Sequence, residues 1–270
     1  MSADFNLFGL TEARFETLLL VVVRVTIMLG LIPVFSARQI PMLVRIGLGF
    51  LIAFVVSQTV STLATPLSLG GLVVAIAAQM FIGLVFGFVS FLVFTGIQFA
   101  GEILDIQVGF GAVNVLNPTT QQQVTIIGEF ELAMATLIYL AADAHHYLLE
   151  GIAGSFAMLP LPFASIDPIV GHDVVEFFTQ ALFLVFKIAG PVAIALIIVN
   201  ISLGLMARVA PQMNVFVVGL PIQVIVGLIM LMVSLPLLGT VLPQVYAETP
   251  RQLDAVMRAM IASPVPSVRP

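Results

Sequence analysis

The sequence predicts an all-α membrane protein with about six long hydrophobic helices, several of them kinked or broken. Of its 270 residues, 60% are hydrophobic and only 9% are charged. Soluble domains contain about 25% charged residues, so this composition is that of a membrane protein. The apolar residues also gather in tracts, and a membrane-spanning helix needs about 20 of them. Six tracts qualify or nearly qualify: residues 15–35, 46–66, 70–101, 126–142, 177–206 and 215–242.

The first tract follows an N-terminal segment, residues 1–14, that contains the acidic residues Asp4 and Glu12. A cleaved signal peptide begins with basic residues and ends at a small-residue cleavage site. Because acids come first in this segment instead, we expect the first tract to be a retained spanning helix.

The third tract is too long for a simple membrane span. Its 32 residues, 70–101, would form a helix of roughly 48 Å, whereas the hydrocarbon core of a bilayer is only ~30 Å thick. We expect this helix either to protrude or to pack on protein. Within it, Gly83 and Gly87 form a pair of small residues that would let another helix approach closely. Prolines inside the later tracts also predict kinks, at Pro191, Pro221 and Pro236.

Charge and composition exclude several classes of function. The formal net charge of −5 argues against nucleic acid as a partner, because phosphate binding needs clustered Lys and Arg. The chain has a single lysine, Lys187, and no cysteine, so it has no thiol nucleophile and no cysteine metal ligand. It also contains no sequence motif of a hydrolase, a zinc peptidase or a nucleotide-binding loop. We expect neither enzymatic activity nor a cofactor.

One group of residues suggests a metal site, namely Asp143 with His145 and His146. Adjacent residues on a helix point about 100° apart, which makes two neighbouring histidines a poor pair of ligands. We therefore interpret them as structural or interfacial residues and expect no metal.

Charged residues inside or at the ends of the tracts are candidates for function, because burying a charge in lipid is unfavourable by about 2.5–3.5 kcal/mol or more. They are Arg24, Lys187, Glu102 and Asp105. In a secondary transporter, the two acids and Lys187 would form a coupling site at broken helices. Alternatively, each charge pairs across a helix–helix or subunit interface. We favour the second interpretation because the acids gather at the end of a tract and not at its centre.

A polar segment separates the third and fourth tracts. Residues 107–128 read QVGFGAVNVLNPTTQQQVTIIG and contain no charge, although they carry several amides and hydroxyls. A solvent-facing loop would normally be charged, and a spanning helix would not normally hold this many amides. An irregular backbone at membrane depth is tolerated only where protein or water surrounds it.

Three segments resemble a known family: FSARQIPMLVRIGLGF (35–50), GEILDIQVGFG (101–111) and NISLGLMARVAPQMNVFVVGLPIQVIVGLIML (200–231). The family is the FliR family of the flagellar type III export apparatus, which has injectisome relatives in the same superfamily. The resemblance extends over residues 15 to 245. It departs from the family at Asn117-Pro118, where members often have Asp-Pro, and at Asp143-Ala144-His145, where many have Asn-Gly-His. The third segment adds further candidates for polar interface contacts: Asn200, Arg208 and Gln212.

The resemblance implies a core subunit of the export gate in the bacterial inner membrane, at the flagellar basal body. Its partners would be FliP-like and FliQ-like subunits, a FlhB-like switch protein and a FlhA-like export component, with unfolded proteins as export substrates and lipid around the gate. The helices would form hairpins that pack on sibling subunits. The implied organisation is a FliP-like part (15–176) with a plug loop (106–125), a FliQ-like hairpin (177–245) and a C-terminal tail (246–270).

The resemblance places the plug in the polar segment, and the residues suit that role. Glycines allow an irregular backbone, an Asn-Pro pair starts a turn, and apolar side chains can fill a narrow lumen. The candidate plug residues are Gly109, Phe110, Gly111, Val113, Val115, Leu116, Asn117 and Pro118. Alternatives are an ordinary re-entrant or surface loop, or an assembly scaffold without a gating role.

Overall fold

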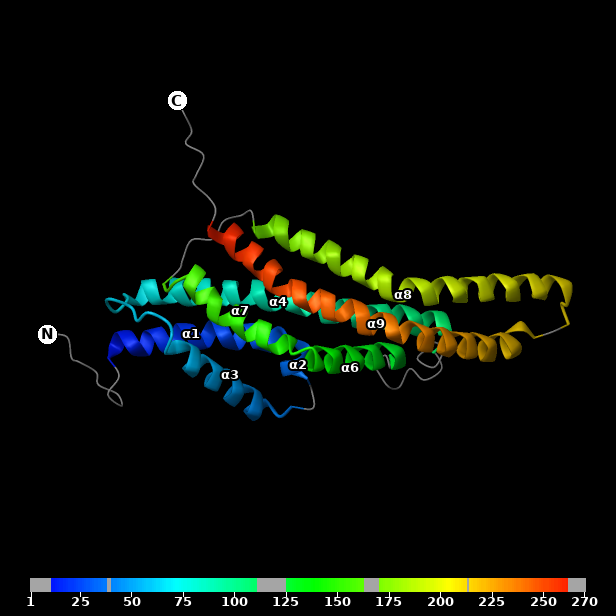
Figure 1. Ribbon diagram of the computed structural model, residues 1–270, viewed down its shortest axis with the longest axis horizontal. Coiled ribbons are helices and arrows are strands. Elements are labelled where there is room, and N and C mark those ends of the chain that lie inside the picture. The colour runs from blue at the N-terminus through cyan, green and yellow to red at the C-terminus, as the bar shows by residue number, and fades with distance from the viewer. Residues whose placement is uncertain (1–10, 38–39, 111–124, 163–169, 213, 262–270) are drawn as a thin grey trace, which may run out of the picture. The chain divides into compact units, whose positions relative to one another are not determined.

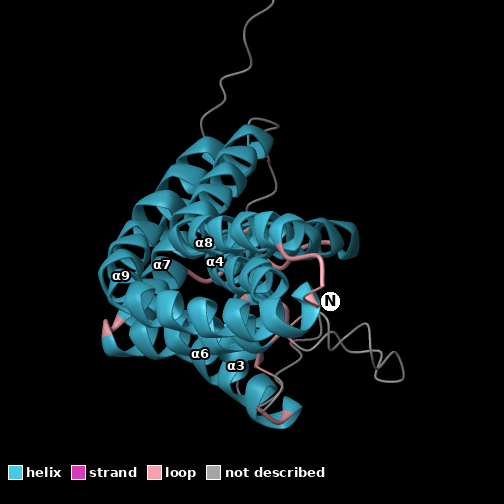
Figure 2. Ribbon diagram, turned by 90° about the vertical axis from the view of Figure 1, so that its right-hand side faces the viewer, coloured by secondary structure: helices cyan, strands magenta, loops and turns pink. Residues whose placement is uncertain are grey.

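The computed structural model describes residues 11–37, 40–110, 125–162, 170–212 and 214–261, and every regular element in these ranges is a helix (Figures 1 and 2). Three of these helices, α4, α8 and α9, are long and apolar enough to cross a membrane. The prediction of an all-α membrane protein is confirmed. In chain order the helices are α1 (Glu12–Leu31), α2 (Pro33–Ser36), α3 (Met42–Ser57), α4 (Leu69–Val108), α6 (Ile126–Ala141), α7 (Ala144–Met158), α8 (Val170–Val209) and α9 (Val215–Ile261).

Each predicted tract contains a helix, but several helix ends differ from the tract ends. Helix α4 continues beyond residue 101 to Val108, and α8 begins at Val170, ahead of residue 177. The second tract was expected to reach residue 66, whereas α3 ends at Ser57, where polar side chains bond to the preceding backbone carbonyls. The last tract was expected to end near 242, whereas α9 continues through Pro243 and Pro250 to Ile261. The added turns bury an apolar stripe, and burial of such a stripe outweighs the hydrogen bonds that proline removes. The stripe consists of Leu253, Val256, Met257 and Met260.

The helix α7 was not expected, because it lies in the acidic stretch between the fourth and fifth tracts. Its buried positions, Leu148, Ile152, Ser155 and Phe156, recur at helical spacing, while the other faces carry Glu150, two histidines and several small residues. An amphipathic helix of this kind has too few apolar residues to register as a tract.

The chain forms two compact units, each built from segments that are distant in sequence. Unit 1 comprises residues 1–92, 144–177 and 247–270. In it, α3 lies along α1, and the N-terminal half of α1 joins a small core with Leu63 and Ala75 around Leu20. Polar bonds support this core, because the backbone N–H of Leu67 donates to Glu16 Oε2 at 2.9 Å.

Unit 2 comprises residues 93–143 and 178–246. It contains the second half of α4, all of α6, and the paired lengths of α8 and α9, which form a hairpin (Figure 1). An aromatic cluster joins three of these helices: Tyr139 lies 5.3 Å from Phe94 and 5.1 Å from Tyr246 between ring centroids. The hydroxyl of Tyr246 also donates to the Ala135 carbonyl at 3.0 Å. Unit 2 therefore holds both ends of the polar segment.

Candidate functional site at the stem of the polar loop

The polar segment leaves α4 and returns to α6 inside unit 2. Helix α4 ends at Val108, and Gly109 follows with φ of +96°, a left-handed conformation that glycine adopts without strain. The chain becomes helical again at Ile126. We call the residues on either side of the loop, Gly101–Gly109 and Thr125–Glu131, the loop stem.

Asp105 fastens the two sides of the stem together. Its carboxylate accepts hydrogen bonds from the backbone N–H of Ile127 at 3.0 and 3.1 Å and of Gly128 at 3.2 Å. The first N–H groups of a helix have no partner within the helix, and the helix dipole favours a negative charge there. Thr125 precedes α6 but makes no side-chain capping bond. The buried Asp105 of α4 therefore caps α6.

Two glycines bring the backbones of α4 and α6 into direct contact beside Asp105. A Cβ atom added at Gly101 would lie 2.5 Å from the Cα of Gly128, and one added at Gly128 would lie 3.1 Å from the carbonyl oxygen of Gln98. A Cβ atom at Gly101 would overlap the backbone of α6, so the crossing requires glycine there, whereas a Cβ atom at Gly128 would fit only if its neighbours moved by a few tenths of an ångström.

Four carboxyl groups belong to the stem, and they differ in exposure. Asp105 and Glu131 are buried, Glu102 is half-buried and Glu129 is exposed. Glu131 is fully buried, and neither carboxyl oxygen has a hydrogen-bond partner among the described residues. Burial, and to a lesser degree the neighbouring Asp105, raise the pKa of Glu131 to about 8. Helix α6 is not among the helices long enough to span the membrane.

Arg24 occupies a second polar site, in unit 1. Its guanidinium donates to Gln79 Oε1 at 2.7 Å, to the Ser155 carbonyl at 3.0 Å and to the Leu159 carbonyl at 2.9 Å. It also lies 4.1 Å from the ring centroid of Phe156. Burial lowers the pKa of Arg24 to about 9, so the side chain is positively charged at neutral pH. Arg24 thus joins α1 to α4 and to the C-terminal end of α7, where carbonyl groups favour a cation.

The predicted packing glycines of α4 lie against α1 in unit 1. A Cβ atom at Gly83 would lie 2.9 Å from the Arg24 carbonyl oxygen, and one at Gly87 would lie 2.7 Å from Leu31 Cδ1. The close approach brings α4 next to the backbone that carries Arg24.

The remaining predicted polar residues belong to the α8–α9 hairpin. Gln223 Nε2 of α9 donates to Asn200 Oδ1 of α8. Arg208 and Gln212 are exposed at the turn of the hairpin, and Lys187 is exposed on α8. Lys187 forms no ion pair with any carboxylate in the described part of the chain. The described contacts of Lys187 therefore give no support to the coupling site of a transporter.

Most of the predicted plug lies outside the described residues. Gly109 and the half-buried Phe110 are described, and the plug remains a prediction. The predicted residues outside the described ranges are Gly111, Val113, Val115, Leu116, Asn117 and Pro118.

Sequence reasoning missed Glu131, Gly128 and the partners of Arg24. Glu131 carried a signal, since an acid inside an apolar tract is a candidate for function. Gln79 and Ser155 carried none, because each is one uncharged polar residue among many and only the fold brings them to Arg24.

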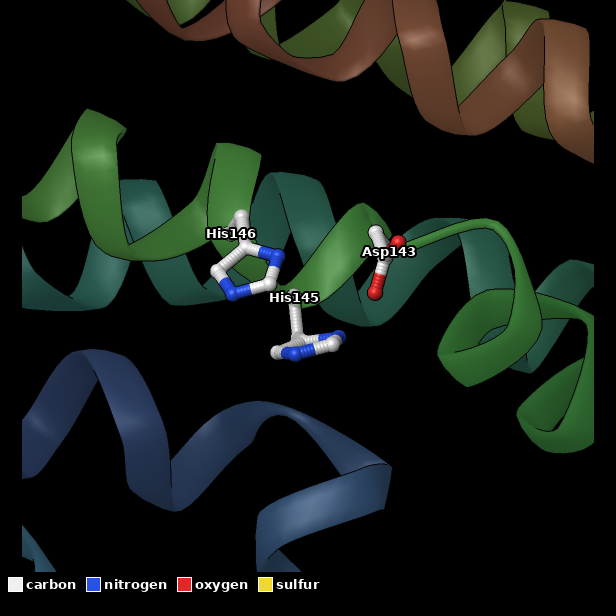
Figure 3. A group of neighbouring side chains, drawn as sticks. All are labelled: Asp143, His145 and His146. Atoms are coloured by element: carbon white, nitrogen blue, oxygen red, sulfur yellow. The ribbon is translucent and has the colours of Figure 1, made fainter.

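Asp143, His145 and His146 are the described residues that could hold a metal ion, since their potential ligand atoms lie within 4.8 Å of one another (Figure 3). The two imidazole rings lie side by side with centroids 4.2 Å apart. They are closer together than expected for adjacent helical residues whose side chains point about 100° apart. Asp143 has φ of +53° in the turn between α6 and α7. Zinc ligands lie about 2.0–2.2 Å from the ion, so the three side chains would still have to converge to bind it.

Comparisons with known proteins cover nearly the whole chain. The family model for bacterial export proteins, family 1, matches residues 15–249. The flagellar biosynthetic protein FliR of Bacillus subtilis is 35% identical over 252 residues, which cover 90% of this chain and 96% of that protein. FliR of Pectobacterium carotovorum is 33% identical over 213 residues, covering 77% and 80%. The Yop proteins translocation protein T of Yersinia pestis is 31% identical over 156 residues, covering 56% and 59%.

Proposed function

The chain belongs to the FliR family of flagellar type III export proteins, and from this premise we propose that it is a core subunit of the export gate. With FliP-like and FliQ-like subunits it would form the channel through which unfolded flagellar proteins cross the bacterial inner membrane at the flagellar basal body. A FlhB-like and a FlhA-like protein would join this complex. Residues 15–176 would form the FliP-like part and residues 177–245 the FliQ-like hairpin. The role is that of a gate and not of a catalyst.

The gating proposal rests on one main observation: the two ends of an uncharged loop are held close together at its stem. Asp105 and the Gly101–Gly128 contact hold the two ends of the loop together at one place in unit 2. A loop with fastened ends can fill a lumen and move aside without unravelling the helices that carry it. The absence of charge suits a seal, because a charge inside it would need a partner in each state of the gate.

The exposed apolar surface of the long helices supports sibling subunits as partners. Only 33% of the most apolar 18-residue stretch of α8 is buried within the chain, and only 28% of the corresponding stretch of α9. The span of α8, Val175–Val209, is about 52 Å long at 1.5 Å per residue, against a hydrocarbon core of ~30 Å. Lipid alone cannot cover that length, so the surplus apolar surface needs other proteins.

The test is the ion conductance of the assembled complex after removal of the loop. Deleting Phe110–Gln121, or replacing it with a glycine–serine linker of equal length, should make vesicles that contain the complex leak small ions. The linker variant is the matched control for strain at the stem, because it preserves the chain length. Native mass spectrometry verifies that each variant has the same subunit composition.

Two outcomes would reject the plug. An unchanged leak in a fully assembled complex would show that the loop does not seal the channel. Loss of assembly in the linker variant, without any leak, would indicate a scaffold role for the loop.

A further inference from the structure

We propose that Glu131 is a proton-binding residue of the loop stem: it is neutral while the stem is closed, and loss of its proton opens the stem. The consequence for export rests on the gate function proposed above, whereas the proton site itself does not. The reaction is a dissociation of one proton from the Glu131 carboxyl group to solvent, and it needs no other reactant.

The first argument is the burial of Glu131 without a partner. Its side chain is fully buried, and neither carboxyl oxygen has a hydrogen-bond partner among the described residues. An ionised carboxylate in such a place is strongly unfavourable, since it has lost water and gained neither a cation nor a donor. The neutral acid is therefore the form that fits the closed stem.

The second argument is the neighbouring charge of Asp105. Its carboxylate accepts the N–H groups at the start of α6, at 3.0–3.2 Å. Two adjacent buried acids do not both ionise readily. Asp105 already accepts these N–H groups, so they are not available to stabilise an ionised Glu131.

The other titratable groups of unit 2 do not offset this arrangement. The other carboxyl groups on α4, on α6 and just after α6 are the half-buried Glu102, the exposed Glu129 and the exposed Asp143, and none of them can supply a positive charge to Glu131. Tyr246 of α9 and Tyr139 of α6 are neutral and belong to the aromatic cluster. The cations of α8 in this unit, Lys187 and Arg208, are both exposed. Within the described part of the chain, no cation forms an ion pair with Glu131.

Ionisation of Glu131 would act on the stem directly. A newly formed carboxylate must either reach water or compete with Asp105 for the N–H groups of Ile127 and Gly128. Both routes displace the first turn of α6, and that turn is where the loop ends. A proton is a better candidate for the ligand than a metal ion. Among the described residues, a group of three potential ligands occurs at Asp143, His145 and His146, and not at the stem.

The chain has no cysteine, which allows a direct test by single-cysteine labelling in the full assembled complex. A cysteine is placed at Thr125, the residue before α6, and its rate of reaction with a maleimide is measured from about pH 6 to about pH 9, on either side of the raised pKa of Glu131. A second preparation carries the cysteine at the exposed Gln58 at the end of α3. Dividing the two rates removes the pH dependence that the two thiols share, and the same preparation with Glu131→Gln gives the remaining pH dependence of the thiol at position 125.

The expected ratio rises by about tenfold per pH unit until the pKa is passed and then levels off, because opening follows the ionised fraction of Glu131. Glu131→Gln, which is neutral at every pH, should give a low and flat ratio. Glu129→Gln is the matched control, an exposed acid on the same helix, and should keep the rise. A flat ratio with Glu131 present, or a rise that persists in Glu131→Gln, would overturn the proposal.

Infrared difference spectroscopy provides a second measurement that does not depend on assembly. The C=O stretch of a protonated carboxyl group should disappear as the pH is raised, and the band should be absent from Glu131→Gln but present in Glu129→Gln. The absence of that band in the unmodified chain would refute the proton site. If labelling follows Glu131 but ion leak never responds to pH or to loop removal, the proton site stands and the gate function fails.

Discussion

Replacing Arg24 with methionine removes the side chain that joins three segments of unit 1. The guanidinium makes four hydrogen bonds to Gln79, Ser155 and Leu159. Hydrogen bonds to charged groups contribute about 1.5–3 kcal/mol each, so the four bonds together contribute about 6–12 kcal/mol. The opposing effect is desolvation, which lowers the pKa of Arg24 from 12.5 to about 9. That difference corresponds to about 5 kcal/mol, which methionine would recover.

The difference favours arginine by about 1–7 kcal/mol, and we expect a net loss in the lower half of this range, about 3 kcal/mol, for Arg24→Met. Arg24→Lys should be at least as destabilising, because lysine keeps the buried charge but cannot reach Gln79 and the end of α7 with one ammonium group. Soluble chains of this size lose about 2–4 °C in melting temperature per kcal/mol, so we expect a decrease of about 6–12 °C.

The assay is a thermal melt followed by circular dichroism in detergent, because the chain has no tryptophan for fluorescence. Arg251→Met is the matched control: Arg251 is 80% exposed and pairs with Glu248 at 3.0 Å on the surface. Surface pairs contribute about 0–1 kcal/mol, so this variant should melt within about 2 °C of the unmodified chain. If Arg24→Met melts like the control, or if Arg24→Lys melts like the unmodified chain, the account of this site is wrong.

Three further predictions concern unit 2. Asp105→Ala should speed amide hydrogen exchange at Ile127 and Gly128 by about tenfold or more, because their buried acceptor is lost; unchanged exchange would show that the cap is unimportant. Gly101→Ala should lower the yield of folded chain, since its Cβ would meet Gly128, whereas Gly154→Ala, with open space around it, should not. Asn200→Leu should destabilise the α8–α9 hairpin by about 0.6–1.7 kcal/mol in a thermal melt. An unchanged melt would show that the hydrogen bond to Gln223 does not stabilise the hairpin.

The helices were largely predictable from sequence. A segment away from water needs apolar side chains and also a backbone whose polar groups are all hydrogen-bonded, and a helix meets the second need. The third tract predicted most of α4, because residues 70–101 contain neither a charged residue nor a proline that would suggest a turn. The end of α9 was not predictable by the same rule. Pro243 resembles a stop signal, and only the tertiary burial of Leu253 and Val256 shows why the helix continues.

The candidate site was predictable in part. Asp105 drew attention as an acid at the end of a tract, but its hydrogen-bond donors lie 22 and 23 residues further along the chain. No local pattern joins residues so far apart, because the contact depends on how α4 crosses α6. Arg24 shows the same division: a charge in an apolar tract signals a site, whereas its uncharged partners become visible only in the folded chain.

The most direct test of the central claim is the native mass of the chain after coexpression with the FliP-like and FliQ-like proteins of the same genome. We predict a discrete hetero-oligomer that contains this chain and remains intact after purification. A monomer or a homo-oligomer that excludes both neighbours would contradict the assignment of this chain to the core of an export gate.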